Sequence, residues 1–429
     1  MVVLSADGMR PDFYRHASKF GLKIPNLRKL VESGASADAV ESVYPSTTYP
    51  AHVTLVTGVL PRKHGIYSHL ASLDPTEKAR PWAWFARAID VPSLWDVAEA
   101  SGRKTAAIAW PVSAGARIAY NIPEIWDPAA PDPLHDFETP ARHSTPHLFS
   151  EVLNAIRSTS SSSKNRHHHS INSMSADRLR TEAALYVWRH YRPHLLLVHF
   201  ADYDQAAHRF GPFAPEALAA VEKMDAEIGR IGDAISFEKS VTLIVLSDHG
   251  FVPVDQEASP LVALLEEGLL GRNARGEPEL GRLGAIHSGG SFAFYWLEEP
   301  TAENRRSLQK AVARLVASGA VREVIDRKRL ELLGADPDAE LMLDAAPSFY
   351  FSDRATGPLV RESVKDRGTH GHLPSVAGME AGLVAAGPGI KRAKNLGRIA
   401  LTQVAPTLAE RLGLAKGVLA TEAAPLDLS

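Results

Sequence analysis

The stretch Val2-Val-Leu-Ser-Ala-Asp7 is a short apolar run that ends at an aspartate, and the pattern recurs along the chain. The runs Leu195–Ala201 and Val241–Ser247 likewise lead to Asp204 and Asp248. Near-continuous apolar runs of this length are typical of strands buried on both faces of a parallel sheet. Because ligands gather at the carboxyl ends of such strands, these aspartates predict one shared site.

Helical patterns alternate with these runs. They cover Ile24–Ser33, Pro92–Ala100, Ala176–Tyr191, Pro215–Ile235 and Thr402–Leu412, and two further strands are expected at Thr105–Trp110 and Gly382–Ala386. Alternating strands and helices predict an α/β fold, specifically an α/β/α sandwich around a mostly parallel central sheet.

Two segments interrupt this alternation. Residues 254–368 contain Gly-rich turns, the alternating stretch Ser291–Leu297 and a charged helical pattern near Ala302–Ser318. We expect them to form a smaller inserted α+β cap lobe on a core made of residues 1–253 and 369–429. Residues 158–175 are rich in Ser and His, and we interpret them as a flexible surface loop rather than a metal site.

Composition excludes several classes of protein. The 429 residues are 45% hydrophobic and 23% charged, with a net charge of -3 and no cysteine. Disulfides, thiolate metal sites and a cysteine nucleophile are therefore excluded. The near-neutral charge does not indicate a nucleic-acid polymer as partner, and no apolar run is long enough for a transmembrane segment.

The sequence leaves the cellular location open. No charged segment followed by an apolar segment precedes the first expected strand, so no signal peptide is recognised. We expect a periplasmic or secreted protein if a leader has been removed, and a cytoplasmic protein otherwise.

Candidate metal ligands occur at the predicted strand ends and in loops. Asp204 and His208 are four residues apart, which places them on one face of a helix. Asp7 ends the first run, Asp248-His249 ends another, and His370-Gly371-His372 follows a turn signal. Each motif alone has an ordinary structural explanation, but together they supply enough carboxylates and imidazoles for two cations. This ligand chemistry suits zinc and tolerates manganese or iron.

A candidate nucleophile lies before a further helix. Ser46, Thr47 and Thr48 precede Pro50, which suits a first helical turn, and an apolar pattern follows from Val53. Such hydroxyls commonly cap helices. A hydroxyl at a helix N-terminus also lies where N–H groups and the helix dipole favour phosphate, and neighbouring cations would make its alkoxide accessible.

Taken together, these motifs resemble the nucleotide pyrophosphatase/phosphodiesterase (type I phosphodiesterase) family of the alkaline phosphatase superfamily. The matching stretches are Leu4–Arg10, Ile24–Leu27, Thr48–His52, Leu55–Gly58, Pro61–Ile66, Leu94-Trp95, Ala109–Pro111, Asp204–Pro212, Leu246–Gly250 and Gly368–Gly371, in family order. The resemblance implies an alkaline-phosphatase-like fold and a metal-dependent phosphoric ester hydrolase.

The resemblance also implies a role for each site residue. One metal would be held by Asp204, His208 and His370, and the other by Asp7, Asp248, His249 and the Thr48 oxygen. Thr48, which directly precedes an aromatic-Pro pair, would attack phosphorus and form a threonyl-phosphate ester. The cofactors implied are two divalent metal ions, with Zn²⁺ expected.

Substrate recognition is implied for three further residues. Tyr49 matches, and Trp126 lies near, positions where family aromatics stack on a nucleobase, which suggests a small, nucleotide-like phosphoester. Burial of Tyr49 and core packing of Trp126 are the alternatives. His69 or Ser68 stands near the position where the family has an Asn that holds a phosphate oxygen, and a histidine would donate the same hydrogen bond. A protonated His69 would favour a more highly charged substrate. His52 and His64, also in family motifs, are interpreted as structural hydrogen-bonding residues.

Two alternatives stay open at this point. One is a phosphomonoesterase or a phosphonoacetate-type phosphonate hydrolase of the same superfamily; a sulfatase is excluded because its Cys/Ser-x-Pro-x-Arg signature is missing. The other is a non-catalytic phosphate-binding protein. The sequence does not indicate an oligomeric state.

Overall fold

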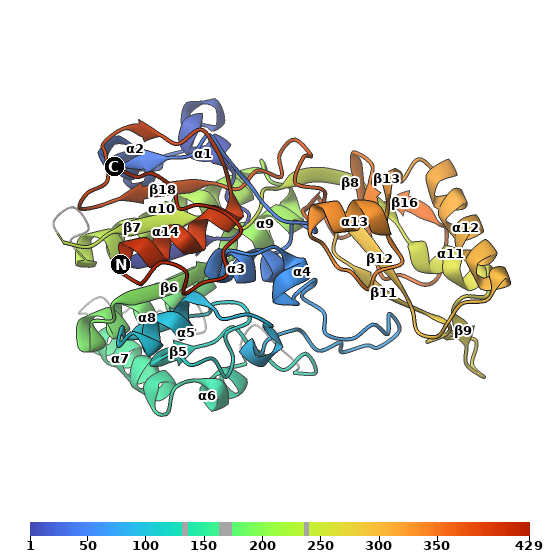
Figure 1. Cartoon of the computed structure of the whole chain (residues 1–429), viewed down its shortest axis with the longest axis horizontal. Helices are drawn as coiled ribbons and strands as arrows, with labels where there is room; N and C mark the ends of the chain where they lie inside the picture. The colour runs from blue at the N-terminus through green and yellow to red at the C-terminus, as the bar shows by residue number, and fades with distance from the viewer. Residues whose placement is uncertain (131–135, 163–173, 236–239) are drawn as a thin grey trace.

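A computed structural model describes residues 1–130, 136–162, 174–235 and 240–429 (Figure 1). The described residues contain an eight-stranded sheet. Its order is β19 (Lys394–Asn395), β2 (Ala35–Ser36), β18 (Leu383–Ala386), β7 (Leu243–Leu246), β1 (Val2–Ala6), β6 (Leu195–Phe200), β4 (Thr105–Ile108) and β5 (Tyr120–Ile122). The strands from β7 to β5 run parallel, whereas β18 is antiparallel to β7. The predicted mostly parallel sheet is confirmed.

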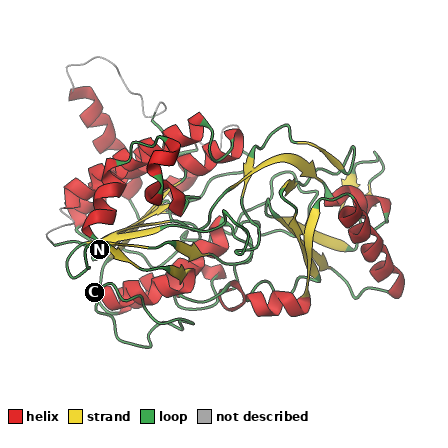
Figure 2. Cartoon of the chain, turned by 90° about the horizontal axis from the view of Figure 1, so that it is seen from above, coloured by secondary structure: helices red, strands yellow, loops and turns green. Residues whose placement is uncertain are grey.

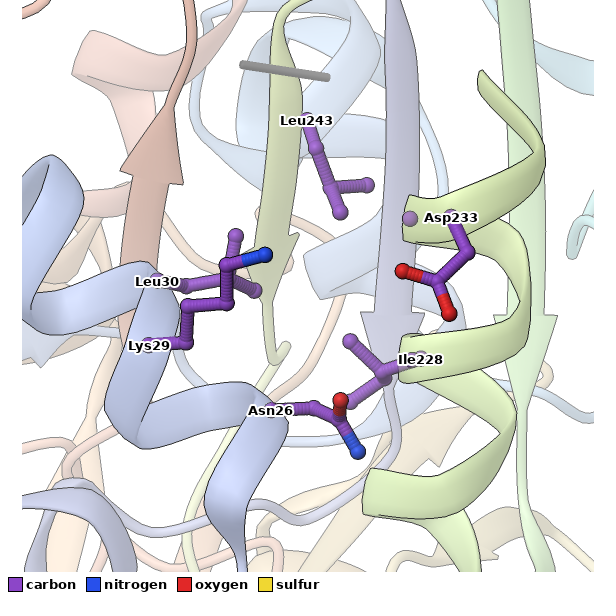
Figure 3. Close-up of a pocket in the computed structure, with 8 residues that line it drawn as sticks. Asn26, Lys29, Leu30, Ile228, Asp233 and Leu243 are labelled. Carbon is purple, nitrogen blue, oxygen red and sulfur yellow. The ribbon is translucent and has the colours of Figure 1, made fainter. Parts of the chain in front are cut away.

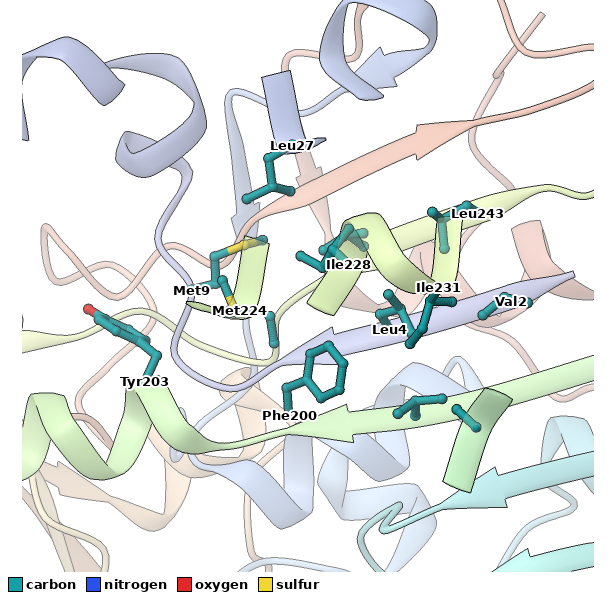
Figure 4. Close-up of a cluster of buried hydrophobic side chains, with 14 of the residues drawn as sticks. Val2, Leu4, Met9, Leu27, Phe200, Tyr203, Met224, Ile228, Ile231 and Leu243 are labelled. Atoms are coloured by element: carbon teal, nitrogen blue, oxygen red, sulfur yellow. The ribbon is translucent and has the colours of Figure 1, made fainter. Parts of the chain in front are cut away.

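Helices cover both faces of this sheet (Figures 1 and 2). One layer includes α2 (Pro25–Ser33), α8 (Ala176–Tyr191) and α10 (Pro215–Ile235), and the other includes α3 (Thr48–Thr57), α5 (Leu94–Ala100) and α14 (Val404–Arg411). Val2 and Leu4 pack into the first layer (Figure 4), and Val3 packs into the second. All five residues of β1 are buried, so helices cover the strand on both faces. The α/β/α sandwich is therefore confirmed.

Most of the remaining core elements in the described residues are short, and α7 is the longest of them with 15 residues. They are α1 (Pro11–Arg15), η1 (Ala17–Phe20), β3 (Ala39–Glu41), α4 (Pro61–His64), η2 (Ala86–Ala88), α6 (Glu138–His143), α7 (Leu148–Ser162), α9 (Asp202–Phe210), β20 (Arg398–Ala400) and η5 (Leu401–Gln403). Within the described part of the chain, no helix combines the length and apolar character that crossing a bilayer requires.

Helix α7 corrects one expectation. Residues 158–162 belong to this helix and not to the expected loop, because the helix that buries Leu148, Val152 and Ile156 continues for one more turn. Ser175 accepts a hydrogen bond from the Arg178 amide and caps α8. The rest of the expected loop, residues 163–173 with the three adjacent histidines, lies outside the described residues.

The N-terminus of α2 is anchored by a carboxylate of α10. Buried Asp225 accepts hydrogen bonds from the Leu27 amide (2.7 Å) and from the Asn26 amide (3.2 Å) and side chain (2.9 Å). The small hollow between these helices (Figure 3) is lined by Leu243, the first residue of β7. The hollow therefore lies at the first end of β7, whereas Asp248 lies beyond its other end.

We expect Asp225→Ala to lower the free energy of unfolding by about 2–4 kcal/mol, because it leaves buried donors without a charged acceptor. Urea denaturation measures this loss. Glu222→Ala is the matched control, since Glu222 accepts from the Lys23 amide at an exposed position (2.8 Å). Equal losses in the two variants would show that the buried anchor is unimportant.

The chain between β7 and β18 builds a second, smaller unit, seen at the right of Figure 1. Its elements are β8 (Val252–Ala258), α11 (Pro260–Glu266), β9 (Gly271–Arg272), β10 (Pro278–Glu279), β11 (Leu283–His287), β12 (Ser291–Trp296), α12 (Ala302–Ala317), β13 (Val321–Asp326), α13 (Arg327–Leu333), β14 (Leu341–Ala345), β15 (Ser348–Phe351), β16 (Val360–Glu362) and β17 (Gly368–Thr369). Strands β11, β12, β14 and β13 form an antiparallel sheet with its own apolar core. The chain leaves the core along β8 and returns to it along β17, and these two strands pair with each other. We propose residues 254–368 as the extent of this cap lobe.

The cap contacts the loop that carries His370. The Gly290 amide, in the β11–β12 turn, donates to the His370 carbonyl oxygen (2.7 Å). Gly371 has φ +90°, and a Cβ there would lie 1.8 Å from the Ser288 carbonyl oxygen. A glycine is therefore required at this position, and the cap holds a candidate metal ligand in place.

Candidate metal centre and nucleophile

The predicted ligands of the core follow three adjacent strands. Asp7 follows β1, Asp248 and His249 follow β7, and helix α9, which carries Asp204 and His208, begins directly after β6. Strand β1 lies between β6 and β7 and is parallel to both, so these side chains converge at one edge of the sheet.

A first group of ligand atoms comes from α9 and the loop after β17. The side chains of Asp204, His208 and His370 place one ligand atom each within 4.8 Å of one another. Both His208 Nε2 and His370 Nε2 lie 3.6 Å from Asp204 Oδ1. This is the trio that the resemblance assigned to one metal.

A second group lies beside the first. Ligand atoms of Asp7, Asp204 and His249 also lie within 4.8 Å of one another, with Asp7 Oδ1 3.3 Å from His249 Nε2. Asp248 Oδ2 lies 3.1 Å from His249 Nε2, while its other oxygen accepts from the Gly8 amide (3.2 Å). Asp204 thus reaches both groups, which the division of ligands made from the sequence did not anticipate.

The carboxylates are poorly satisfied by the protein alone. Asp7 Oδ1, Asp204 Oδ1 and Asp248 Oδ2 are buried and have no hydrogen-bond partner among the described residues. Burial, and then the negative charges of its neighbours, raise the pKa of both Asp204 and Asp248. Burial, followed by His249, lowers the pKa of His370 and keeps that imidazole neutral. Unpaired carboxylate oxygens beside neutral imidazoles fit bound divalent cations.

Thr48 is the first residue of α3, and its hydroxyl faces the second group. Thr48 Oγ1 lies 3.4 Å from Asp7 Oδ2 and 3.4 Å from His249 Nε2. The competing explanation was a helix cap. Ser46 Oγ instead donates to the Val43 carbonyl oxygen, and Thr47, the N-cap residue, makes no side-chain cap bond. None of these contacts is a cap of α3, and the Thr48 hydroxyl faces the second ligand group.

His372 lies apart from both groups. Its Nδ1 lies 3.7 Å from Asp344 Oδ2 in the cap, and its side chain is buried. Of the two histidines in the His370-Gly371-His372 stretch, only His370 reaches Asp204.

Tyr49 requires a correction. Its side chain has no exposed surface, its hydroxyl donates to Glu124 Oε1 (3.1 Å), and its ring meets the Trp82 ring edge-on. A base cannot stack on a face that is already covered, so Tyr49 supports the site from within. Trp126 is half-buried and packs edge-on against Trp82 and Trp84, and we keep it as a candidate for base stacking.

His69 is half-buried, with its ring 4.6 Å from the Trp82 ring and 6.2 Å from the ring of His287 in the cap. Burial, and then the neighbouring His287 and Arg80, hold the pKa of His69 well below its ordinary value. A neutral imidazole offers one N–H donor, as an Asn side chain would. The expected role of a protonated His69 in selecting a more highly charged substrate is thus unsupported.

His52 and His64 are buried and make the hydrogen bonds that a structural role requires. His52 Nδ1 lies 2.8 Å from the Thr48 carbonyl oxygen, and His64 Nε2 lies 3.1 Å from Thr54 Oγ1. His64 Nδ1 also accepts from the Ile66 amide (3.1 Å), which fixes the turn after α4.

Sequence reasoning missed His199 and Glu124. His199 lies in β6 and bridges Glu124 Oε2 (2.9 Å) and Asp7 Oδ2 (3.1 Å). Burial opposes its charge, but Glu124 and Asp7 outweigh burial and raise the pKa of His199. A polar residue within the apolar run Leu195–Ala201 was the signal available in the sequence. Trp82 and Trp84 carried no such signal, because they lie in an irregular segment.

The convergence of buried aspartates, histidines and a hydroxyl at the strand ends of an α/β sandwich defines a candidate metallohydrolase. Residues 1–373 match the family described as type I phosphodiesterase / nucleotide pyrophosphatase, and the chain belongs to this family. Among curated relatives, ectonucleotide pyrophosphatase/phosphodiesterase family member 3 of Rattus norvegicus is 24% identical over 266 residues, covering 58% of this chain and 24% of the relative. An uncharacterized pyrophosphatase/phosphodiesterase of Schizosaccharomyces pombe is 27% identical over 257 residues, covering 59% and 45%. The chain thus matches about a quarter to a half of the length of these relatives.

Solved structures show the same fold. An inactive variant of murine ectonucleotide pyrophosphatase / phosphodiesterase 5, in complex with AMP, superposes with a TM-score of 0.66 at 17% identity, covering 97% of this chain and 95% of that one. The human protein of the same name gives a TM-score of 0.65 at 16% identity, with the same coverage.

Proposed function

We propose that this protein is a two-metal hydrolase that cleaves phosphodiester or pyrophosphate bonds in nucleotide-like substrates through an ester on Thr48. The observation that carries the proposal is the position of Thr48 Oγ1, 3.4 Å from both Asp7 Oδ2 and His249 Nε2, at the start of α3. The unpaired oxygens of Asp7, Asp204 and Asp248 support cation binding at the same place. When bound, such cations neutralise charge on the phosphoryl group and lower the pKa of a coordinated hydroxyl.

The protein's own groups divide the remaining work. Thr48 Oγ1 attacks phosphorus and the bond to the leaving oxygen breaks, which leaves a threonyl-phosphate ester for water to hydrolyse. Asp204, His208 and His370 would hold one cation, and Asp7, Asp248 and His249 would hold the other, with Asp204 close enough to contribute to both. The N-terminus of α3 presents its positive dipole end to the phosphoryl group.

A nucleotide-like substrate is supported by the aromatic side chains beside the nucleophile. Trp126, Trp82 and Trp84 form an edge-on cluster, of which Trp126 and Trp82 are half-buried. His69, whose ring lies 4.6 Å from the Trp82 ring, would donate a hydrogen bond to a phosphate oxygen. The structurally similar murine protein was solved with AMP, which fits the same class of ligand.

The test is a side-by-side assay of the metal-replete protein on a phosphodiester, a phosphomonoester, a dinucleotide and phosphonoacetate. We expect the highest kcat/KM for the dinucleotide or the phosphodiester. A preference for the monoester or for phosphonoacetate would replace the proposed function by the corresponding alternative. A protein that binds no metal and turns over none of the four would instead be a non-catalytic binding protein.

Trp126→Ala should weaken recognition of the base and leave the chemical step intact. Base stacking on an aromatic side chain contributes about 1–3 kcal/mol, so KM for p-nitrophenyl thymidine 5′-phosphate should rise roughly 5- to 150-fold. The matched substrate is methyl p-nitrophenyl phosphate, which has the same leaving group and no base, and its kcat/KM should stay unchanged. Trp126→Phe should recover part of the loss. Equal effects on both substrates would assign Trp126 to packing.

A further inference from the structure

Glu124 follows β5 and has both carboxylate oxygens engaged. Oε1 accepts a hydrogen bond from the Tyr49 hydroxyl (3.1 Å), and Oε2 lies 2.9 Å from His199 Nδ1. Arg180 Nη2 lies 3.8 Å from Oε2 and supplies a positive charge behind it. The side chain of Glu124 is 10% exposed, so these contacts and not water fix its orientation.

His199 connects Glu124 to a candidate metal ligand. Its ring is buried in β6, with Nδ1 toward Glu124 and Nε2 3.1 Å from Asp7 Oδ2. The two ring nitrogens of His199 thus contact one carboxylate each. Asp7 Oδ2 therefore contacts His199 Nε2 and accepts a hydrogen bond from the Thr48 hydroxyl. Asp7 Oδ1 has no hydrogen-bond partner among the described residues. The bridge turns Oδ1 toward the metal centre.

Tyr49 connects the same carboxylate to the nucleophile. It directly follows Thr48 on α3, and its buried ring allows the hydroxyl little freedom. Two chains of contacts, or arms, start at Glu124. The His199 arm leads through His199 to Asp7, and the tyrosine arm leads through Tyr49 to the backbone of Thr48. Asp7 follows β1, Glu124 follows β5, His199 lies in β6, and Thr48 and Tyr49 lie in α3, so this link joins elements that are far apart in the sequence.

We propose that Glu124 is a positioning residue that holds the nucleophile Thr48 and the ligand Asp7 in register, acting through Tyr49 and His199. This role rests on the hydrolase function proposed above. Hydrogen-bond partners of metal ligands orient them, and their loss typically costs roughly 10- to 100-fold in metal affinity or activity. Loss of the His199 arm should lower metal affinity, and loss of the tyrosine arm should lower activity.

Three variants test the arms. His199→Gln should weaken the zinc affinity of one of the two sites roughly 10- to 100-fold. Competition with a chromophoric chelator measures this affinity. Tyr49→Phe keeps the buried ring and should leave zinc affinity unchanged while it lowers kcat more than it raises KM. Glu124→Gln should show both defects, and adding Tyr49→Phe to it should lower kcat little further because the arm is already broken.

Tyr14→Phe is the matched control for the tyrosine arm. Tyr14 is buried, and its hydroxyl donates to the Ala37 carbonyl oxygen (2.7 Å) away from the site, so its loss should lower the melting temperature and leave kcat unchanged. If the three site variants lower only the melting temperature, with wild-type zinc affinity and kcat, Glu124 serves packing alone and the positioning role is refuted.

The affinity comparison does not depend on turnover. If the wild-type protein binds zinc but hydrolyses none of the four substrates, the proposed function is wrong. The ratio of zinc affinities between wild type and His199→Gln then still tests whether the His199 arm positions Asp7. Equal zinc affinities in the two proteins overturn the role of Glu124 in positioning Asp7.

Discussion

Replacing Thr48 by alanine should lower kcat/KM for a p-nitrophenyl phosphodiester by at least about 10³-fold, because no other hydroxyl replaces the attacking oxygen. Metal content should stay at about two ions per chain, since the carboxylates and imidazoles of both groups are untouched. Initial rates of p-nitrophenol release, together with metal analysis of the same dialysed sample, measure both quantities.

Thr47→Ala is the matched control for this variant. Thr47 is the adjacent residue, it is buried whereas Thr48 is half-buried, and its hydroxyl makes no side-chain cap bond within the described structure. Its removal should change the rate by less than about threefold, as for a substitution outside the chemistry. Full activity in the Thr48 variant, or an equal loss in both, would defeat the assignment of the nucleophile.

His370→Ala should lower the metal content from about two ions per chain to about one and reduce activity at least about 100-fold. The reason is geometric, because His370 Nε2 lies 3.6 Å from Asp204 Oδ1 within the first ligand group. Inductively coupled plasma mass spectrometry after exhaustive dialysis measures the loss.

His372→Ala is the control two residues away. His372 faces Asp344 in the cap and should affect stability without removing a metal ion. A variant pattern in the opposite sense, with metal lost from His372→Ala and retained in His370→Ala, would show that the ligand assignment is wrong.

Much of the fold followed from local pattern. The apolar runs that end at Asp7 and Asp248 are strands β1 and β7, and the run that leads to Asp204 is β6. Since parallel neighbours present their carboxyl ends at one edge, periodicity was enough to predict that the aspartates converge. The four-residue spacing of Asp204 and His208 was enough to place both on one face of α9.

The features that the sequence did not predict depend on tertiary packing. The sequence left pocket lining and burial open for Tyr49, and the structure shows it buried, with its ring edge-on to Trp82 and its hydroxyl donating to Glu124. No local pattern brings Glu124 from beyond β5 to His199 in β6. The position of Asp204 between the two ligand groups is likewise set by the approach of α9 to the end of β1.

Anomalous diffraction from crystals of the zinc-loaded protein, recorded at the zinc absorption edge, tests the central claim most directly. The expected result is two peaks: one among Asp204, His208 and His370, and one among Asp7, Asp248 and His249 with Thr48 Oγ1 beside it. A single peak, or peaks that lie away from these side chains, would contradict a two-metal centre with a threonine nucleophile.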